Sequence, residues 1–580
     1  MSDFRNSTVY QIYVKSFCDS NGDGIGDING IRQKLDYLQE LGVDYLWITP
    51  FFLSPMNDNG YDIADYLSIN PMFGTMEDVD ALIREAEAHG IGLMFDMVFN
   101  HTSTSHAWFQ KALTGDPEYM DYYIFRDPVD GHAPTNWVSK FGGNAWEYVP
   151  SLGKYYLHLF DVSQADLNWE NPRVREELKN VIRFWKDKGV AGFRFDVVNL
   201  ISKPDVLEDD FEGDGRRFYT DGPRIHQYLK ELVGDTGIAD RMTVGEMSST
   251  SLENCLRYAN PAEKELKMVF SFHHLKVDYR GGDKWSLMEP DFKELRNLFV
   301  KWQEGMQAGN AWNAVFWCNH DQPRAVSRFG DDQKYWKESA KMLAALIHLM
   351  RGTPYIYEGE ELGMTNAGYT SIDQYRDVES TNYYRILTEE KGLSDAAALE
   401  IIGARSRDNG RTPMQWDGSQ YAGFSTVEPW LGIPANHSYI NVEAEKQDPD
   451  SIYAFYKKLV ALRREYEIIA DGSIRFTDAG NDNIISYVRE LDGQKLYVFC
   501  NLRGTDQRIG GAAAGTEQGC GTAPDSGSAG LLSDAPFAVP GGKILISNYG
   551  KAENAVTARA TDGTAETAVL RPYEVIAVLQ

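Results

Sequence analysis

Carboxylate side chains stand at the ends of short hydrophobic runs, where they could take part in catalysis. Asp196 lies within such a run and Arg194 precedes it by two residues, so both side chains would point to the same side of a strand. The fixed positive charge of Arg194 would keep the Asp196 carboxylate ionised. Glu246 ends another run and has no cationic neighbour in the sequence, which is consistent with a carboxyl group that stays protonated. Asp321 follows a third run, so three carboxylates are candidates for one catalytic site.

Eight short runs rich in Val, Ile and aromatic residues have the composition of buried strands. They are residues 8–14, 44–49, 92–99, 191–198, 242–247, 268–273, 314–318 and 353–357. Most are separated by stretches with the apolar spacing of amphipathic helices, such as Leu35, Leu38 and Leu41 before the second run. This alternation of strand and helix predicts a (β/α)8 TIM barrel, an α/β fold. Because active sites of such barrels lie at the carboxyl ends of the strands, carboxylates at several of these ends are expected to be catalytic.

Two parts of the chain interrupt this alternation. Residues 102–170 follow the third run and are too long for a simple loop, so we expect a small inserted domain over the site. After about residue 470 the pattern changes to short strands, which predicts a C-terminal all-β sandwich domain. Within it, residues 510–530 are rich in Gly, Ala, Ser and Thr and are expected to form a flexible loop. The expected domains are the first part of the barrel at 1–101, the inserted domain at 102–170, the second part of the barrel at 171–470 and the sandwich at 471–580.

Composition and charge limit the possible partners. The 580 residues are 43% hydrophobic and 24% charged, as in ordinary globular proteins. With 57 basic and 85 acidic residues the net charge is −28, so the chain should repel nucleic acid and anionic membrane surfaces. No signal peptide and no apolar run long enough to span a membrane is visible, and the five cysteines have no zinc-binding spacing. These features predict a cytoplasmic protein with reduced thiols. The cysteines are Cys18, Cys255, Cys318, Cys500 and Cys520.

Five sequence blocks resemble the signature motifs of the α-amylase superfamily of glycoside hydrolases. The blocks are DMVFNH (96–101), QADLN (164–168), GFRFDVV (192–198), VGEM (244–247) and FWCNHDQ (316–322). The resemblance implies a barrel with an inserted domain after the third strand and a β-sandwich at the end. It also implies that Asp196 is the nucleophile, Glu246 the general acid/base and Asp321 the third carboxylate of a retaining glycosidase.

The same resemblance implies which residues bind the sugar. Matched residue by residue, the substrate-binding candidates are Asp62, His101, Phe141, Gln164, Arg194, Val197, His320 and Arg407. Asp62 and Arg407 look like the pair that closes the far end of the subsite for the cleaved glucose, with Arg411 as a competing choice for the arginine. A closed end implies a pocket, and hence an exo-acting enzyme on short substrates.

The segment DSNGDGIGD (19–27) carries oxygen donors at the alternate positions that begin an EF-hand loop. The expected ligands are Asp19, Asn21, Asp23, the Ile25 carbonyl and Asp27. The glutamate expected at the twelfth position is absent, since Gly30 stands there, and a metal-free loop of Asx turns is the alternative. Related glucosidases bind Ca²⁺ in such a loop, so the resemblance favours a structural Ca²⁺ away from the chemistry.

Residues near the expected leaving-group subsite bear on the substrate. Val197 matches the residue that α-1,6-acting members of the oligo-1,6-glucosidase group carry after the nucleophile. A finer resemblance, in the segments FSFHHLKVDYRGGDKW and YRDVESTN, is to members that act on trehalose 6-phosphate. Lys276 and Lys284 follow the sixth predicted strand, and such cations suit a phosphorylated disaccharide better than a neutral glucan. We expect these two lysines, rather than Arg280, to contact the phosphate.

The expected reaction is hydrolysis of trehalose 6-phosphate to glucose and glucose 6-phosphate with retention of configuration. One alternative is an α-1,6-glucosidase acting on isomaltose and short isomalto-oligosaccharides. Another is a sugar isomerase that transfers the glucosyl group instead of giving it to water. A non-catalytic relative is disfavoured because Asp196, Glu246 and Asp321 are all present.

Overall fold

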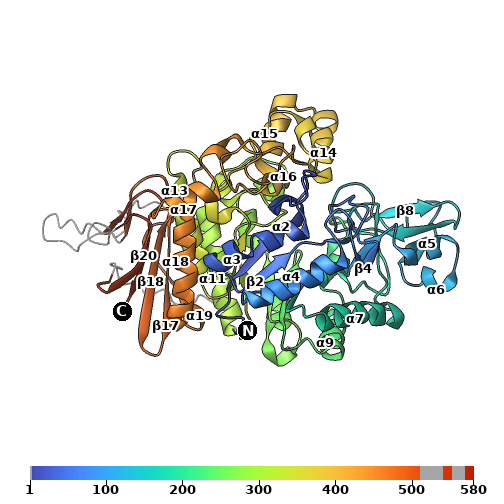
Figure 1. Cartoon of the computed structure of the whole chain (residues 1–580). Coiled ribbons are helices and arrows are strands. Elements are labelled where there is room, and N and C mark those ends of the chain that lie inside the picture. Colours follow the sequence, from blue (N-terminus) through green and yellow to red (C-terminus); the bar gives the residue numbers. More distant parts are fainter. Residues whose placement is uncertain (1–2, 510–539, 551–567) are drawn as a thin grey trace.

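The computed structural model describes residues 3–509, 540–550 and 568–580, and a barrel of parallel strands forms its centre (Figure 1). The strands are β1 (Val9–Ile12), β2 (Tyr45–Ile48), β5 (Gly92–Met97), β11 (Gly192–Phe195), β12 (Met242–Met247), β13 (Met268–Ser271), β14 (Ala314–Val315) and β15 (Thr353–Tyr357). They pair in the order β13-β12-β11-β5-β2-β1-β15-β14, and a parallel bridge between Val269 and Asn313 joins the two ends. All the predicted runs form strands, and the predicted barrel is confirmed.

Helices cover the outside of the barrel with their apolar faces. Those that follow the strands in turn are α3 (Leu35–Leu41), α4 (Met76–Ala88), α7 (Pro172–Asp187), α9 (Ile225–Thr236), α10 (Leu252–Ala259), α11 (Phe292–Ala308), α13 (Trp336–His348) and α18 (Ile452–Glu465). Helix α7 shows why such a segment forms a helix at this place. The Asn171 side chain caps its first turn, Pro172 is its first residue, and Leu178 and Ile182 are buried on one face.

The segment between β5 and α7 forms the insertion that the sequence predicts. Its elements are β6 (His101–Ser103), α5 (Ala107–Leu113), α6 (Pro117–Met120), β7 (Phe125–Arg126), β8 (Trp146–Val149), β9 (Lys154–Leu157) and β10 (Gln164–Asp166). Trp137, Trp146 and Leu157 pack together with Val197 and Tyr219 of the segment after β11. This contact places the insertion over the carboxyl ends of the strands.

A second excursion, which the sequence analysis did not separate from the barrel, lies between β15 and α18. Its elements include α14 (Val378–Arg385), a π-helical turn (Ile386–Glu390), α15 (Asp395–Arg405), α16 (Asp408–Arg411) and α17 (Val442–Gln447). Figure 1 shows α14 and α15 above the barrel. The excursion supplies Glu379 and Arg407 to the site described below.

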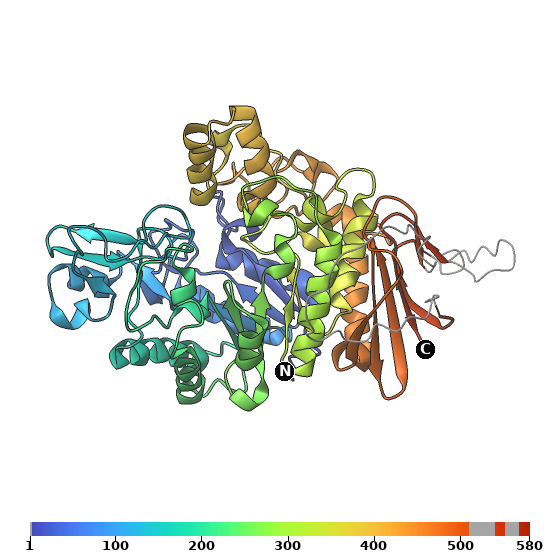
Figure 2. The same cartoon turned by 180° about the vertical axis from the view of Figure 1, so that it is seen from behind.

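The chain after α19 (Glu467–Ala470) is all-β in its described part, as predicted. The strands are β16 (Ser473–Thr477), β17 (Ile484–Leu491), β18 (Gln494–Asn501), β19 (Gln507–Ile509), β20 (Lys543–Ser547), β21 (Ala568–Leu570) and β22 (Val575–Leu579). They form a five-stranded sheet, β16-β17-β18-β22-β20, and a two-stranded sheet, β19-β21. Both views show this region on the side of the barrel opposite the insertion (Figures 1 and 2). The expected flexible loop at 510–530 lies outside the described residues.

Within the described residues, none of the helices has the length and apolarity needed to cross a membrane. Cys18, Cys255, Cys318 and Cys500 are buried and carry free thiols, whereas Cys520 lies outside the described part of the chain.

Candidate active site

A pocket of about 170 Å³ opens at the carboxyl ends of the barrel strands. Its lining is Asp58, Tyr61, His101, Phe141, Phe160, Gln164, Asp196, Val197, Glu246, Lys284, Asp321, Gln322, Glu379 and Arg407. The structure thus brings all three predicted catalytic carboxylates into one pocket, together with most of the predicted substrate-binding residues. The lining residues that were not predicted are Asp58, Tyr61, Phe160, Gln322 and Glu379.

Arg194 joins the carboxylates of neighbouring strands. Its buried guanidinium donates hydrogen bonds to Asp96 at 2.7 Å and to Asp196 at 2.6 Å, and it forms an ion pair with Glu246. The expected pairing with Asp196 is present. Glu246 has no cationic neighbour in the sequence, but the structure gives it one in space. Parallel pairing of β11 with β12 sets Arg194 beside Val244, two residues before Glu246. The neighbour therefore comes from the adjacent strand and not from the local sequence.

Asp321 is held ionised by three basic groups. His320 Nε2 lies 3.2 Å from one carboxylate oxygen, Arg411 donates to the other at 2.9 Å, and Arg407 donates to the same oxygen at 3.3 Å. Burial opposes ionisation, but these neighbours outweigh it and hold the pKa of Asp321 well below its usual range. Asp321 is thus an anionic group at the base of the pocket.

The far end of the pocket is closed by Asp58 and Arg407, not by Asp62. Arg407 Nη2 lies 3.3 Å from an Asp58 oxygen, and both residues line the pocket. Asp62 instead accepts hydrogen bonds from the Ser54 hydroxyl and the Asn57 amide, which shape the turn between β3 (Phe52–Leu53) and β4 (Asp65–Ile69). The prediction of Asp62 is therefore wrong. Both aspartates stand in the segment DNGYD, and only the turn decides which one faces the pocket.

Of the two arginines considered for this closing pair, Arg407 lines the pocket whereas Arg411 does not. Arg411 is buried and donates through Nε to the His320 carbonyl. The structure thus supports the choice of Arg407.

His101 and Gln164 form a hydrogen-bonded wall with the missed residue Tyr61. Gln164 Nε2 lies 3.1 Å from His101 Nε2 and donates to the Tyr61 carbonyl at 3.1 Å and to Asp58 at 3.2 Å. The Tyr61 ring stacks on His320, with the ring centroids 5.1 Å apart, so His320 supports the wall from behind and does not line the pocket.

Val197 lies in the left-handed backbone region with φ of 32°, which is rare for a β-branched residue. This conformation ends β11 abruptly after Asp196 and turns the chain into a short 3₁₀ helix (Val198–Leu200). The sharp turn lets Asp196 and Val197 both line the pocket.

The two predicted phosphate-binding lysines have different surroundings. Lys284 lines the pocket, but its ammonium group donates to Glu379 at 2.6 Å. Lys276 is an exposed residue outside the pocket lining, and partial desolvation of its ammonium group together with the nearby Arg216 lowers its pKa. Lys140, a residue that the sequence analysis missed, donates to the Ser248 hydroxyl at 2.8 Å. Burial, Arg216 and Lys276 among other neighbours lower the pKa of Lys140 to about 7.

The segment 19–27 folds into a loop whose side chains bond to its own backbone. Asp19 accepts from the amides of Asn21, Gly22 and Gly24, and Asp23 accepts from the Ile25 amide. Asp27 caps α2 (Ile28–Gln33) by accepting from the Gly30 amide. Hard oxygen donors of this kind suit Ca²⁺. In the described part of the chain no three acidic, His or Cys side chains converge as a metal cluster. Calcium binding by this loop stays a prediction.

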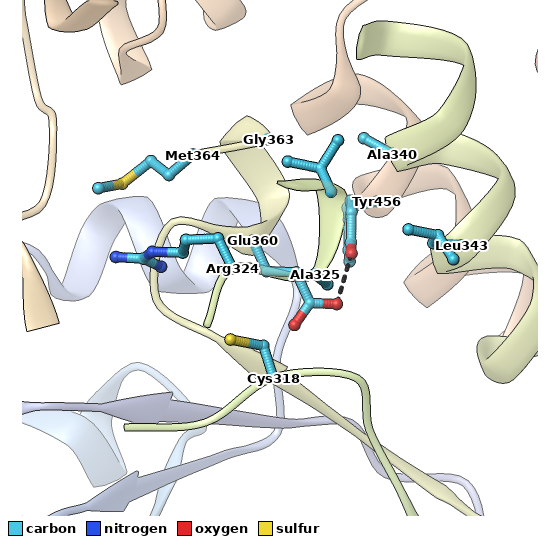
Figure 3. Close-up of a pocket in the computed structure, with 10 residues that line it drawn as sticks. Cys318, Arg324, Ala325, Ala340, Leu343, Glu360, Gly363, Met364 and Tyr456 are labelled. Atoms are coloured by element: carbon cyan, nitrogen blue, oxygen red, sulfur yellow. Dashed lines mark hydrogen bonds between the residues drawn. The ribbon is translucent and has the colours of Figure 1, made fainter. Parts of the chain in front are cut away.

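Three buried glutamates follow β15 outside the catalytic pocket. Glu361 accepts from the hydroxyls of Tyr10 and Tyr37 at 2.7 Å. Figure 3 shows the Glu360 carboxyl pointing toward the Tyr456 hydroxyl, which donates to it at 2.8 Å. Burial raises the pKa of Glu360 to about 7 and the pKa of Glu358 well above its usual range. These bonds tie β1, α3 and α18 to the loop after β15.

Comparisons with known proteins agree with this geometry. The family described as "Alpha amylase, catalytic domain" matches residues 11–472. The trehalose-6-phosphate hydrolase of Bacillus subtilis (strain 168) is 53% identical over 506 residues, which cover 87% of this chain and 90% of that protein. An oligo-1,6-glucosidase of Parageobacillus thermoglucosidasius is 47% identical over 507 residues, covering 86% and 90%.

Among solved structures, the trehalose-6-phosphate hydrolase of Bacillus licheniformis superposes with a TM-score of 0.89 at 48% identity, covering 99% of both chains. A trehalulose synthase of Pseudomonas mesoacidophila gives a TM-score of 0.89 at 37% identity, covering 100% of this chain and 99% of that one. With the matched domain and the catalytic geometry together, this chain belongs to the α-amylase family of glycoside hydrolases.

Proposed function

We propose that the protein is a retaining, exo-acting α-glucosidase that hydrolyses trehalose 6-phosphate to glucose and glucose 6-phosphate. The observation that carries the phosphate part is a cluster of basic residues from three separate segments, Lys140, Arg216 and Lys276. Lys140 is bonded to Ser248, two residues after Glu246, and Arg216 and Lys276 lie close enough to lower its pKa. The names of the relatives that are 53% identical support the same substrate.

In the first step Asp196 attacks the anomeric carbon while Glu246 gives its proton to the departing glycosidic oxygen. A covalent glycosyl-enzyme forms and the second sugar leaves. In the next step Glu246 takes a proton from water, which attacks the anomeric carbon and releases glucose with its configuration retained. One guanidinium, that of Arg194, contacts the side chains of both Asp196 and Glu246, which keeps the two carboxyl groups close together as double displacement requires.

The neighbouring groups fix the sugar and favour the oxocarbenium-like transition state. Asp321 is anionic, so it stabilises developing positive charge and accepts from sugar hydroxyls. The Asp58–Arg407 contact closes the end of the pocket, so a single terminal glucosyl unit fits beyond the scissile bond. Exo-action on short substrates follows from this closure.

The cation cluster would hold the phosphate of the leaving sugar. Lys140 is fixed by Ser248, two residues after Glu246, and its ammonium group lies 5.8 Å from the ring centroid of Phe160, which lines the pocket. Arg216 donates to Asp214 at 2.9 Å, and the carboxylates that act on Lys140 are Asp214 and Asp166, so three basic residues face two carboxylates in this part of the described chain. This local excess of positive charge opposes the −28 of the whole chain.

Lys284 has another role in this proposal, because Glu379 already neutralises it. Removing Lys284 would leave Glu379 with the more distant Arg407, at 3.6 Å, as its cationic partner in the described chain. Because Glu379 and Arg407 both line the pocket, the loss would impair every substrate. Lys276 and Lys140 would affect the phosphorylated substrate alone.

The test is the ratio of kcat/KM for trehalose 6-phosphate to that for an aryl α-glucoside. A charge-assisted hydrogen bond contributes about 1.5–3 kcal/mol, so Lys276→Ala and Lys140→Ala should each lower this ratio about 10- to 150-fold. Lys284→Ala should lower both rates together, and Lys495→Ala, at a half-buried lysine in β18 that pairs with Glu490, is the control. Equal losses on both substrates for Lys276→Ala would contradict the phosphate assignment.

The second candidate is an α-1,6-glucosidase, favoured by Val197 in the pocket and by the 47% identity to an oligo-1,6-glucosidase. Initial rates on trehalose 6-phosphate, trehalose and isomaltose, measured side by side, separate the two. A wild-type preference for isomaltose would establish the second candidate and reject the first. Product analysis with sucrose separates a transglycosylating isomerase from both.

A further inference from the structure

A second cavity, of about 580 Å³, lies between the barrel and the C-terminal domain. Its walls come from the loop between β13 and α11, from α12 (Ala325–Phe329), from α15, and from Arg503 and Tyr573 of the C-terminal domain. None of its lining residues lines the catalytic pocket. The volume is in the range that holds small-molecule ligands.

Four arginines line this cavity, and two of them lack an acidic partner. Asp278 binds both Arg328 and Arg405, so one carboxylate serves two guanidinium groups. Arg280 donates to the Leu287 carbonyl at 2.8 Å, and Arg503 donates through Nε to Asn483 at 3.1 Å. Neither Arg280 nor Arg503 has a carboxylate within 4 Å in the described ranges of the chain. Both therefore retain N–H groups that a ligand can use.

An excess of guanidinium groups around a cavity is notable in a chain with a net charge of −28. The guanidinium fork matches the oxygens of a phosphate in pairs, and it remains charged at all relevant pH values. Arg280, which was not favoured as a phosphate contact of the catalytic pocket, lines this second cavity. Its chemistry still suits a phosphate, but at a different site.

The rest of the lining suits a sugar. Glu289 and Glu400 line the cavity without an ion-pair partner among the residues that the structure places, and carboxylates accept hydrogen bonds from sugar hydroxyls. Tyr573 adds an aromatic ring, and its amide donates to the Arg503 carbonyl at 2.9 Å, which holds the two residues together. Charged donors for a phosphate and acceptors for hydroxyls thus face one space.

Arg328 connects the two cavities. It lines the second cavity, and its Nη1 donates at 2.7 Å to the side-chain oxygen of Gln322, which lines the catalytic pocket beside Asp321. Arg328 also forms a two-pronged contact with Asp278. A ligand that pulls on Asp278 or Arg328 would therefore change the position of Gln322 at the catalytic pocket.

We propose that this cavity is an effector site for a phosphorylated monosaccharide, which acts on the catalytic pocket through Arg328 and Gln322. Arg280 and Arg503 bind the phosphate, and Glu289 and Glu400 accept from the sugar hydroxyls. This proposal does not depend on the substrate proposed above.

Calorimetric titration of the full-length protein with glucose 6-phosphate tests the binding. The double variant Arg280→Gln/Arg503→Gln should lose one class of sites, with affinity there at least 10-fold lower, while Arg475→Gln in β16 should bind like the wild type. Inorganic phosphate should bind this site more weakly than glucose 6-phosphate, and glucose should bind it weakest. If the double variant does not fold, Arg503→Gln alone is used, with an expected loss of about 10-fold.

Hydrolysis of an aryl α-glucoside tests the effect on the catalytic pocket, because this substrate carries no phosphate. Glucose 6-phosphate should change kcat in the wild type, and this change should disappear in the double variant while its rate without effector stays at the wild-type level. The Lys276→Ala variant should retain the effect, since its change lies outside the second cavity. Identical titrations for wild type and double variant, equal affinity for glucose, or purely competitive inhibition would each overturn the proposal.

Discussion

The buried carboxyl group of Glu360 makes stability depend on pH in a direction opposite to that of an ordinary salt-bridged acid. Its pKa is about 7 in the folded protein, because burial disfavours the anion, and the Tyr456 hydrogen bond offsets this only in part. The ordinary glutamate value is 4.5. The folded state therefore binds the proton more tightly than the unfolded state. The stabilisation is complete below pH 4.5 and is lost as the pH rises through 7.

The size of the effect follows from the shift. The pKa of Glu360 in the folded protein lies about 2.5 above the ordinary value, and each pKa unit corresponds to 1.36 kcal/mol. The free energy of unfolding above pH 8 is therefore about 3 kcal/mol lower than it is at acid pH. Glu360→Gln keeps an acceptor for Tyr456 and cannot ionise, so it should be more stable than the wild type at pH 8.5 and equal to it near pH 4.5. For a unit the size of residues 11–472, the unfolding entropy is about 1 kcal/mol per degree, so the expected rise in Tm is about 3 °C.

Scanning calorimetry from pH 4.5 to 8.5 measures this difference. The other buried acids, such as Glu358 and Glu361, are present in both proteins, so the comparison reports Glu360 together with its interaction with Glu361. The exposed Glu443→Gln is the matched control and should leave Tm unchanged at every pH. A pH-independent difference, or a wild type that is more stable at pH 8.5, would refute the assignment of a protonated Glu360.

The remaining predictions concern the site and the loop at 19–27. Asp196→Asn and Glu246→Gln should each lower kcat by about 10³-fold or more without changing Tm, and substrates with good leaving groups should partly restore the first step in Glu246→Gln. Near-wild-type turnover of Asp196→Asn, after a check for deamidation, would exclude it as nucleophile. Asp58→Asn should raise KM with little change in Tm, because Asp58 faces the pocket. Asp62→Asn should instead lower Tm, because Asp62 stabilises the turn between β3 and β4. The reverse pattern would restore the original choice of Asp62. Chelation should lower Tm more than kcat, and Asp23→Ala should match the chelated protein; identical melting with and without Ca²⁺ would mean a metal-free turn.

The strands and their order along the chain were predictable, because a buried parallel strand needs a continuous apolar run and each run has a distinct helix after it. The long excursion between β15 and α18 was not separated from the barrel. Its helices α14 and α15 pack on one another and on Trp285, forming a small core of their own. Helical spacing alone does not distinguish such a core from a barrel helix, because both present one apolar face.

Contacts between residues far apart in the sequence limited how much of the site could be predicted. Arg194 was correctly paired with Asp196, since residues two apart on a strand share a face, but its contact with Glu246 depends on the register between β11 and β12. Lys284 was recognised as a pocket cation, yet its partner Glu379 lies 95 residues further along the chain. Lys140 comes from the insertion and meets Ser248 across 108 residues. Basic residues close together in the sequence are therefore candidates for phosphate binding. Which of them can bind the phosphate depends on whether an acidic residue from a distant part of the chain already neutralises it. By that criterion Lys140 and Lys276 are favoured over Lys284, and this is the order that the substrate-ratio experiment measures.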